Sequence, residues 1–158
     1  MKTAVIFSTT LAICVPASAS AKPHCPQIPG YAQAEAWDER VRSGDPHAAS
    51  CLALRLRVFD GAKLEDALVA LGEFGDRRPV ELLELAHRGE LSRDSLSDAV
   101  RMLSLSLTDE FPAQLAAMKA RRERFRRVTR PELASERRIA LKSIDSALAE
   151  IKANVPSR

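Results

Sequence analysis

The chain has 158 residues, of which 46% are hydrophobic and 28% are charged, and it carries a formal net charge of +3. This length is enough for one domain with a substantial core. Aromatic residues make up only 4% of the chain, and no segment has the turn residues of a β-hairpin. A composition rich in alanine and leucine therefore favours closely packed helices over a β-sandwich.

The first 21 residues predict a cleavable signal peptide. The apolar run "TAVIFSTTLAICV" is too short to span a bilayer, and the small-residue string "ASASAK" follows it. Ala19 and Ala21 fit the pattern of a signal peptidase site, so we place cleavage after Ala21. No later segment is apolar enough to cross a membrane, and we expect a periplasmic or secreted protein. Lipidation of Cys14 is an alternative, although bulky Ile13 stands where a lipoprotein signal needs a small residue.

Residues 22–30 form a proline-rich leader, "KPHCPQIPG", which we expect to be extended. Removal of the signal peptide leaves two cysteines, and exported proteins keep disulfides. We therefore predict a Cys25–Cys51 disulfide that ties the leader to the helical domain. The alternative is a zinc or copper site in which His24 and His47 join the two cysteines. We expect the disulfide and no cofactor.

Apolar spacing, prolines and capping residues predict one helical domain over residues 31–155. Gly72 and Gly75 are expected to end the third helix, with Gly75 at its C-terminal cap. Thr129 and Glu132 are expected to form a capping box before the last helix. The alternating segment "LSLSLT", residues 103–108, is assigned to the fifth helix because its leucines continue the apolar stripe of that helix. The seven expected helices cover approximately residues 31–42, 46–58, 62–75, 79–88, 93–107, 112–128 and 131–153.

Helix breakers recur at a regular spacing. Asp76-x-x-Pro79-x-x-Leu82 and Asp109-x-x-Pro112-x-x-Leu115 match at an offset of 33 residues, and Asp45-Pro46 is a looser copy 31 residues before Asp76. A period of this length that contains a helix pair is typical of an α-solenoid, in which each pair packs only on its neighbours.

The stretch "ALGEFGDRRPVELLELA", residues 70–86, resembles the junction between HEAT-type repeats. In that family a helix ends at Leu-Gly-x-x-Gly-Asp and the next begins with an apolar turn. The matching residues here are Leu71, Gly72, Gly75, Asp76, Val80 and Leu83. The resemblance covers about residues 44–128. It implies short antiparallel hairpins, arranged as a small α-solenoid or helical bundle, and a binding scaffold without chemistry of its own.

The positive charge gathers near the C-terminus. Residues 22–118 have a net charge of −5, whereas residues 119–158 have a net charge of +7. Arginine forks suit carboxylate and phosphate groups, so an acidic partner is one interpretation of the run "KARRERFRRVTR". The other interpretation is a solvent-exposed helix whose charges serve only solubility. Export argues against nucleic acid. The candidate partner-binding residues are Arg121, Arg122, Arg124, Arg126, Arg127 and Arg130.

No catalytic signature is present in the sequence. It lacks a nucleophile elbow, a His-Glu-x-x-His zinc motif and a phosphate-binding glycine loop. Acidic pairs such as Glu81/Glu84 leave an envelope hydrolase as one alternative. The stretch "LTDEFPAQLAAMKARRERFRR" is also similar to periplasmic stress chaperones and metal sensors, with Leu107 and Thr108 matching their L-T-x-x-Q box. Phe111 stands where that box has Gln.

From these features we expect a non-enzymatic, exported protein-binding module. The most concrete form of this prediction is an inhibitor or immunity-type protein that acts against an envelope-acting enzyme or toxin. Its small size, rigid disulfide-linked scaffold and lack of catalytic motifs motivate this choice.

Overall fold

A computed structural model describes Cys25, residues 31–107 and residues 110–154. The expected signal peptide, residues 1–21, lies outside the described residues. So does the expected leader, residues 22–30, apart from Cys25.

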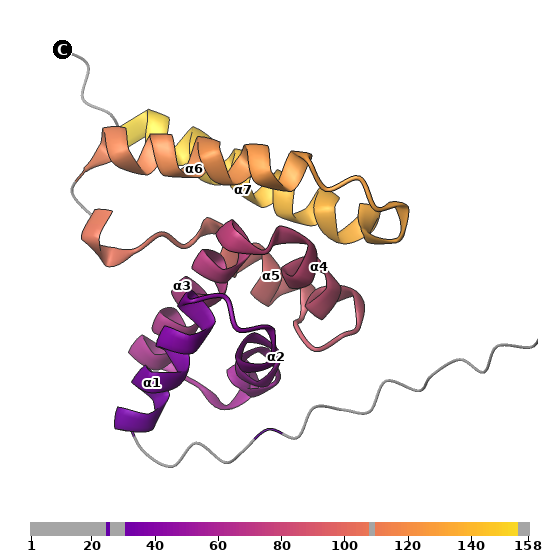
Figure 1. Ribbon diagram of the computed structural model, residues 1–158. Coiled ribbons are helices and arrows are strands. Elements are labelled where there is room, and N and C mark those ends of the chain that lie inside the picture. The colour runs from indigo at the N-terminus through magenta and orange to yellow at the C-terminus, as the bar shows by residue number, and fades with distance from the viewer. Residues whose placement is uncertain (1–24, 26–30, 108–109, 155–158) are drawn as a thin grey trace, which may run out of the picture.

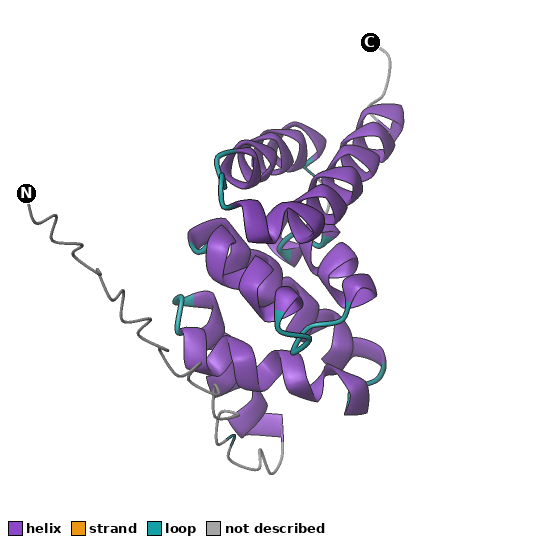
Figure 2. Ribbon diagram, turned by 90° about the vertical axis from the view of Figure 1, so that its right-hand side faces the viewer, coloured by secondary structure: helices purple, strands orange, loops and turns teal. Residues whose placement is uncertain are grey.

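All regular structure in the described part of the chain is helical, and seven α-helices confirm the all-α prediction (Figures 1 and 2). Three short 3₁₀ helices, η1 to η3, follow α2, α5 and α6. The elements are α1 (Tyr31–Arg42), α2 (Pro46–Arg55), η1 (Leu56–Val58), α3 (Gly61–Arg77), α4 (Pro79–His87), α5 (Arg93–Arg101), η2 (Leu105–Leu107), α6 (Phe111–Arg126), η3 (Pro131–Leu133) and α7 (Ala134–Asn154).

The helices stack in chain order. α1 packs on α3, α3 on α5 and α5 on α7, while α2 packs against α1, α3 and α4. Figure 1 shows the indigo helices α1 and α2 at one end of the stack and the orange and yellow helices α6 and α7 at the other. α5 and α6 do not form a close hairpin, since α6 packs mainly against α7 and runs antiparallel to it. The last two helices therefore close one end of the array.

Prolines mark the start of each even-numbered helix. Pro46 and Pro79 are the first residues of α2 and α4, and Pro112 is the second residue of α6. Proline is favoured there because its fixed φ suits the first turn and its missing N–H would have no partner within the helix. The 33-residue offset between Pro79 and Pro112 thus separates the starts of successive even-numbered helices.

Side-chain caps begin two of the helices. Asp45 caps α2, and its Oδ1 accepts hydrogen bonds from the amides of His47 and Ala48 at 3.0 and 3.1 Å. Burial opposes the ionisation of Asp45, but these amides and the Arg40 guanidinium outweigh it, and its pKa lies below the ordinary value. Ser92 caps α5, because its Oγ accepts a hydrogen bond from the Ser95 amide at 3.0 Å.

The prediction that Gly72 and Gly75 end a helix is wrong. α3 continues through both glycines to Arg77, and both are buried. A Cβ atom on Gly72 would lie 2.4 Å from the carbonyl oxygen of Ala99, and one on Gly75 would lie 2.6 Å from Leu82 Cδ2. These glycines let α5 and α4 approach the backbone of α3 closely. The close packing of these helices outweighs the low helix propensity of glycine, so α3 continues through both positions.

The prediction that the fifth helix continues through "LSLSLT" is also wrong. α5 ends at Arg101, and Met102 is extended with ψ of 133°. The carbonyl of Val100 accepts a hydrogen bond from the Arg121 side chain, which replaces the amide of another helical turn. The chain then forms the 3₁₀ helix η2, and Thr108 and Asp109 lie outside the described residues.

The predicted capping box of Thr129 and Glu132 does not form. The N-cap residue of η3 is Arg130, without a side-chain hydrogen bond to the helix, and α7 begins only at Ala134. Glu132 instead accepts a hydrogen bond from Arg130 at 2.7 Å. The Glu132 carboxylate is therefore bound by Arg130 and does not accept the backbone hydrogen bond that a capping box requires.

One continuous cluster of buried apolar side chains forms the core, from Val41 in α1 to Leu148 in α7. Phe74 of α3 and Phe125 of α6 are its largest apolar members. None of the described helices combines the length and hydropathy that a membrane span requires.

Cys25 and Cys51 form the predicted disulfide, with their Cα atoms 5.3 Å apart and a sequence separation of 26. Cys51 lies in α2 and is only 1% exposed. Closing a loop of this length contributes roughly 3 kcal/mol in the chain-entropy model. The bond anchors the residues before α1 to the end of the stack formed by α1 and α2.

Candidate functional site

The arginine-rich run lies on the second half of α6 and on the turn to α7. Arginine, alanine, methionine and glutamate are good helix formers, and the run contains no internal breaker before Val128. Met118, Arg121 and Phe125 are spaced by three and four residues and form the buried stripe of this helix. The remaining arginines of α6 therefore point away from the core.

Arg121 is a core residue and not a surface residue. Its side chain is 1% exposed. Nε and Nη2 donate to the two carboxylate oxygens of Asp76 at 2.9 and 2.7 Å. Nη1 donates to the carbonyl oxygens of Val100 and Met102 at 3.0 and 2.6 Å. The expectation that Arg121 contacts a partner is therefore corrected, because every group around its guanidinium belongs to this chain.

Two of the exposed arginines are paired with carboxylates of other helices. Arg122 Nε lies 2.5 Å from Asp145 Oδ1 of α7, and this hydrogen bond raises the pKa of Arg122. Arg124 Nη1 lies 3.4 Å from Asp76 Oδ1, the carboxylate that also holds Arg121. Both pairs tie α6 to a neighbouring helix.

Arg130 is paired on two sides. It donates to Glu132 at 2.7 Å and also to Glu84 of α4. The hydrogen bond to Glu132, followed by the one to Glu84, raises the pKa of Arg130. The pKa of Glu132 is lowered by a backbone hydrogen bond within its own residue and then by Arg130. Arg130 thus joins α4 to the turn before α7.

Arg126 and Arg127 differ from the other arginines because, among the described residues, they pair only with a carboxylate of α6 itself, Glu123, and with no other helix. Both pair with Glu123, at 3.5 and 3.3 Å, and their side chains are 58% and 76% exposed. Two guanidinium groups against one carboxylate leave an uncompensated positive charge at this end of α6. We call the five exposed arginines the α6 basic surface: Arg122, Arg124, Arg126, Arg127 and Arg130.

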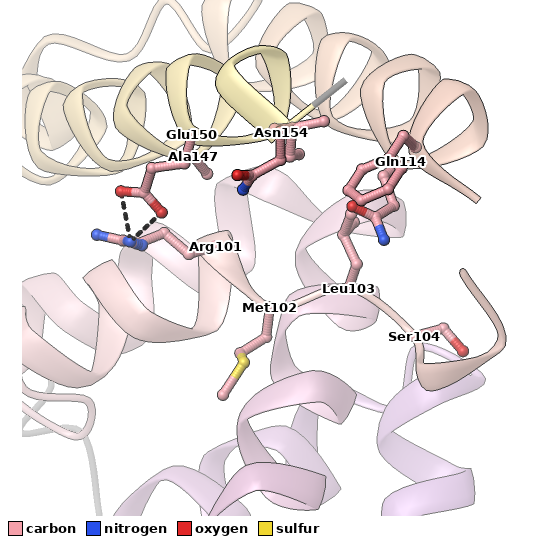
Figure 3. Close-up of a pocket in the computed structure, with 10 residues that line it drawn as sticks. Arg101, Met102, Leu103, Ser104, Gln114, Ala147, Glu150 and Asn154 are labelled. Atoms are coloured by element: carbon pink, nitrogen blue, oxygen red, sulfur yellow. Dashed lines mark hydrogen bonds and ion pairs between the residues drawn. The ribbon is translucent and has the colours of Figure 1, made fainter. Parts of the chain in front are cut away.

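A hollow of about 380 Å³ lies between the end of α5, the extended segment after it, and the ends of α6 and α7 (Figure 3). Arg101 spans it from α5, and its Nη2 donates to both carboxylate oxygens of Glu150 at 2.9 and 2.8 Å. Met102 and Leu103 supply apolar lining, and Gln114 supplies an amide. The single ion pair here is internally satisfied, so the hollow has no evident charge to offer a ligand.

His47 lies apart from the α6 basic surface, whereas one of the acidic pairs reaches it through Arg130. His47 is exposed on α2, with its ring 6.4 Å from that of Trp37, and His24 lies outside the described residues. Within the described residues no group of three metal-ligating side chains is present. Glu81 pairs with Arg78, and Glu84 pairs with Arg88 and Arg130.

His87 is the last residue of α4. Its Nδ1 lies 3.7 Å from Oε1 of Glu136. Glu136 is 8% exposed, and its Oε2 has no hydrogen-bond partner among the described residues. This buried carboxylate had no signal in the sequence, because it lies on a mostly polar stretch of α7.

The role of Asp76 was also missed. The sequence marked it as a helix-breaking residue of the repeat junction, yet it lies inside α3 and binds two arginines of α6. It is separated from Arg121 by 45 residues, so only the stacking of α6 beside α3 brings the two charges together. No known family model, curated protein or solved structure matches this chain.

Proposed function

We propose that this protein is a non-enzymatic binding module that recognises an acidic partner protein through the α6 basic surface. The observation that carries the proposal is the sharing of Glu123 by the two most exposed arginines, Arg126 and Arg127. A carboxylate of a partner can bind either guanidinium without breaking an ion pair between helices. Arginine suits such contacts, because its planar fork binds a carboxylate through two parallel hydrogen bonds.

The proposed place of action is the cell envelope or the extracellular space. The disulfide between Cys25 and Cys51 supports it, since disulfides persist in oxidising compartments and are rare in the cytosol. The signal peptide expected over residues 1–21 supports the same place. An inhibitor or immunity-type protein, which neutralises an envelope-acting enzyme or toxin, is the most specific form of the proposal.

The ion pairs determine which variant tests this proposal. Reversing the charge of Arg122 or Arg124 by substitution with glutamate would break its ion pair with Asp145 or Asp76 on another helix. A loss of binding in such a variant would then also report a change in helix packing. Reversing the charges of Arg126 and Arg127 breaks only their ion pairs with Glu123, which lies within about one helical turn of both. R126E/R127E is therefore the informative variant.

The experiment compares the wild type with R126E/R127E in affinity capture from native envelope extract at low salt, followed by mass spectrometry. We expect an acidic protein that the wild type enriches and the variant loses, and this capture should weaken as salt rises. The matched control is R57E/K152E, which makes the same change in charge at exposed residues of η1 and α7. Equal capture by R126E/R127E and the wild type would remove this surface from the proposal.

A further inference from the structure

A second groove, of about 390 Å³, lies between α5 and α7 and shares Arg101 with the hollow in Figure 3. Its lining differs in chemistry from that hollow, because cationic and hydroxyl side chains dominate it. The groups that matter are Arg93, Asp94, Ser97 and Arg101 of α5, with Lys142 and Ser143 of α7. We call it the serine groove.

One hydroxyl hydrogen of the Ser97–Ser143 pair has no hydrogen-bond acceptor among the described residues. Ser97 Oγ and Ser143 Oγ lie 2.6 Å apart, and either one can donate to the other. Each hydroxyl has one hydrogen, so the serine that accepts still has its own hydrogen to donate. The hydroxyl of Ser146 is already used, since it donates to Glu150 at 3.1 Å. Ser143 is 9% exposed and Ser97 is half-buried, and the spare hydrogen can lie on either of them.

The cations around this pair favour an anionic acceptor. Neither Arg93 nor Lys142 has a carboxylate within ion-pair distance among the described residues, whereas Arg101 is held by Glu150. Asp94 lines the same groove and offsets one positive charge. Two unpaired cations against one carboxylate leave the groove positive, which attracts an anion.

We propose that the serine groove binds a phosphate group. The spare serine hydrogen would be donated to one phosphate oxygen, while Arg93 and Lys142 would bind the others from the two walls. Phosphate suits this set because it presents several acceptor oxygens and a charge that exceeds one at neutral pH. The phosphate could be free in solution or belong to a lipid headgroup, and the experiment distinguishes these two sources. This site shares no residue with the α6 basic surface, so it does not depend on the proposed function.

The test uses the full chain with its disulfide intact. Calorimetric titration with inorganic phosphate at low ionic strength measures saturable binding, and co-sedimentation with phosphatidylglycerol vesicles measures binding to a lipid headgroup. We expect R93Q/K142Q to weaken binding at least about tenfold and S143A to weaken it several-fold, because each removes charge-assisted or buried hydrogen bonds. Circular dichroism checks that the helices of each variant are intact.

The matched control is R138Q/K152Q, which removes two positive charges from α7 outside the groove. This control should change the affinity much less than R93Q/K142Q, since neither Arg138 nor Lys152 lines the groove. Phosphate binding without vesicle binding identifies a soluble ligand, and vesicle binding that R93Q/K142Q abolishes identifies a lipid; either result supports the site. Absence of saturable binding in both arms overturns the proposal, as does an equal loss in R138Q/K152Q.

Discussion

At the residue scale, the guanidinium group of Arg121 holds three parts of the molecule together. It binds the carboxylate of Asp76 in α3 and the carbonyls of Val100 and Met102 at the end of α5, while it belongs to α6. A buried cation is stable only when its hydrogen bonds are satisfied, and here its donors on all three nitrogens are engaged. Arg121 therefore determines where α5 ends as well as how α6 lies on α3.

Replacing Arg121 should destabilise the protein strongly. R121M should lower the free energy of unfolding by about 3 kcal/mol, because the two carbonyls lose a donor and Asp76 loses its main partner. R121K should rescue only part of this loss, since a lysine has no fork that reaches both Asp76 and the carbonyls. Urea denaturation measures both effects. R122M, which removes an exposed arginine one position away, should have a much smaller effect; equal losses would contradict the role assigned to Arg121.

At the scale of elements, α3 is the central helix of the stack, and its glycines determine how close its neighbours lie. Gly72 faces the backbone of α5, where the nearest atom is the carbonyl oxygen of Ala99, whereas Gly75 faces the side chain of Leu82 in α4. A side chain can rotate away from an added methyl group, but a backbone carbonyl of a packed helix cannot move without moving that helix.

The two glycines should therefore respond differently to alanine. G72A should cost about 1–3 kcal/mol of stability through overpacking, in spite of the better helix propensity of alanine. G75A gains the same propensity and should cost less, because Leu82 can repack. Thermal unfolding followed by circular dichroism compares the two variants directly. A G72A protein as stable as G75A would mean that α5 can shift away from α3 at little cost.

At the scale of the whole molecule, the disulfide lies at one end of the stack and the α6 basic surface at the other. α1 and α2 hold the disulfide end, and α6 and α7 close the opposite end (Figure 1). The buried core between them is continuous from Val41 to Leu148. Loss of the disulfide should accordingly lower the stability of the whole molecule without removing its helices.

Cleavage of the Cys25–Cys51 bond tests this expectation. Dithiothreitol or the C25S variant should lower the free energy of unfolding by about 3 kcal/mol, since the unfolded chain regains the entropy of an open loop. Far-ultraviolet circular dichroism should stay nearly unchanged at 25 °C. We choose Cys25 because Cys51 is buried and a serine there would place a hydroxyl in the core. A protein that loses most of its helix on reduction would show that the core alone does not hold the stack.

The sequence by itself determined the features that local interactions decide. The start of each even-numbered helix follows from a proline, the cap of α2 from Asp45, and the bounds of α1 from the segment between Gly30 and Ser43. These features depend on residues a few positions apart, so the pattern along the chain contains them. The pairing of two cysteines also follows, because only two remain in the expected mature chain.

Only the tertiary structure decided the features that depend on distant parts of the chain. The glycines of α3 do not end a helix because α4 and α5 pack against them, and the leucines after Arg101 leave the helix where Arg121 binds the carbonyls. Arg121 and Arg127 lie in the same arginine-rich run, yet one is buried beside Asp76 and the other is exposed. Local sequence sets where helices begin, whereas the packing of helices distant in sequence sets where they end and which charges remain on the surface.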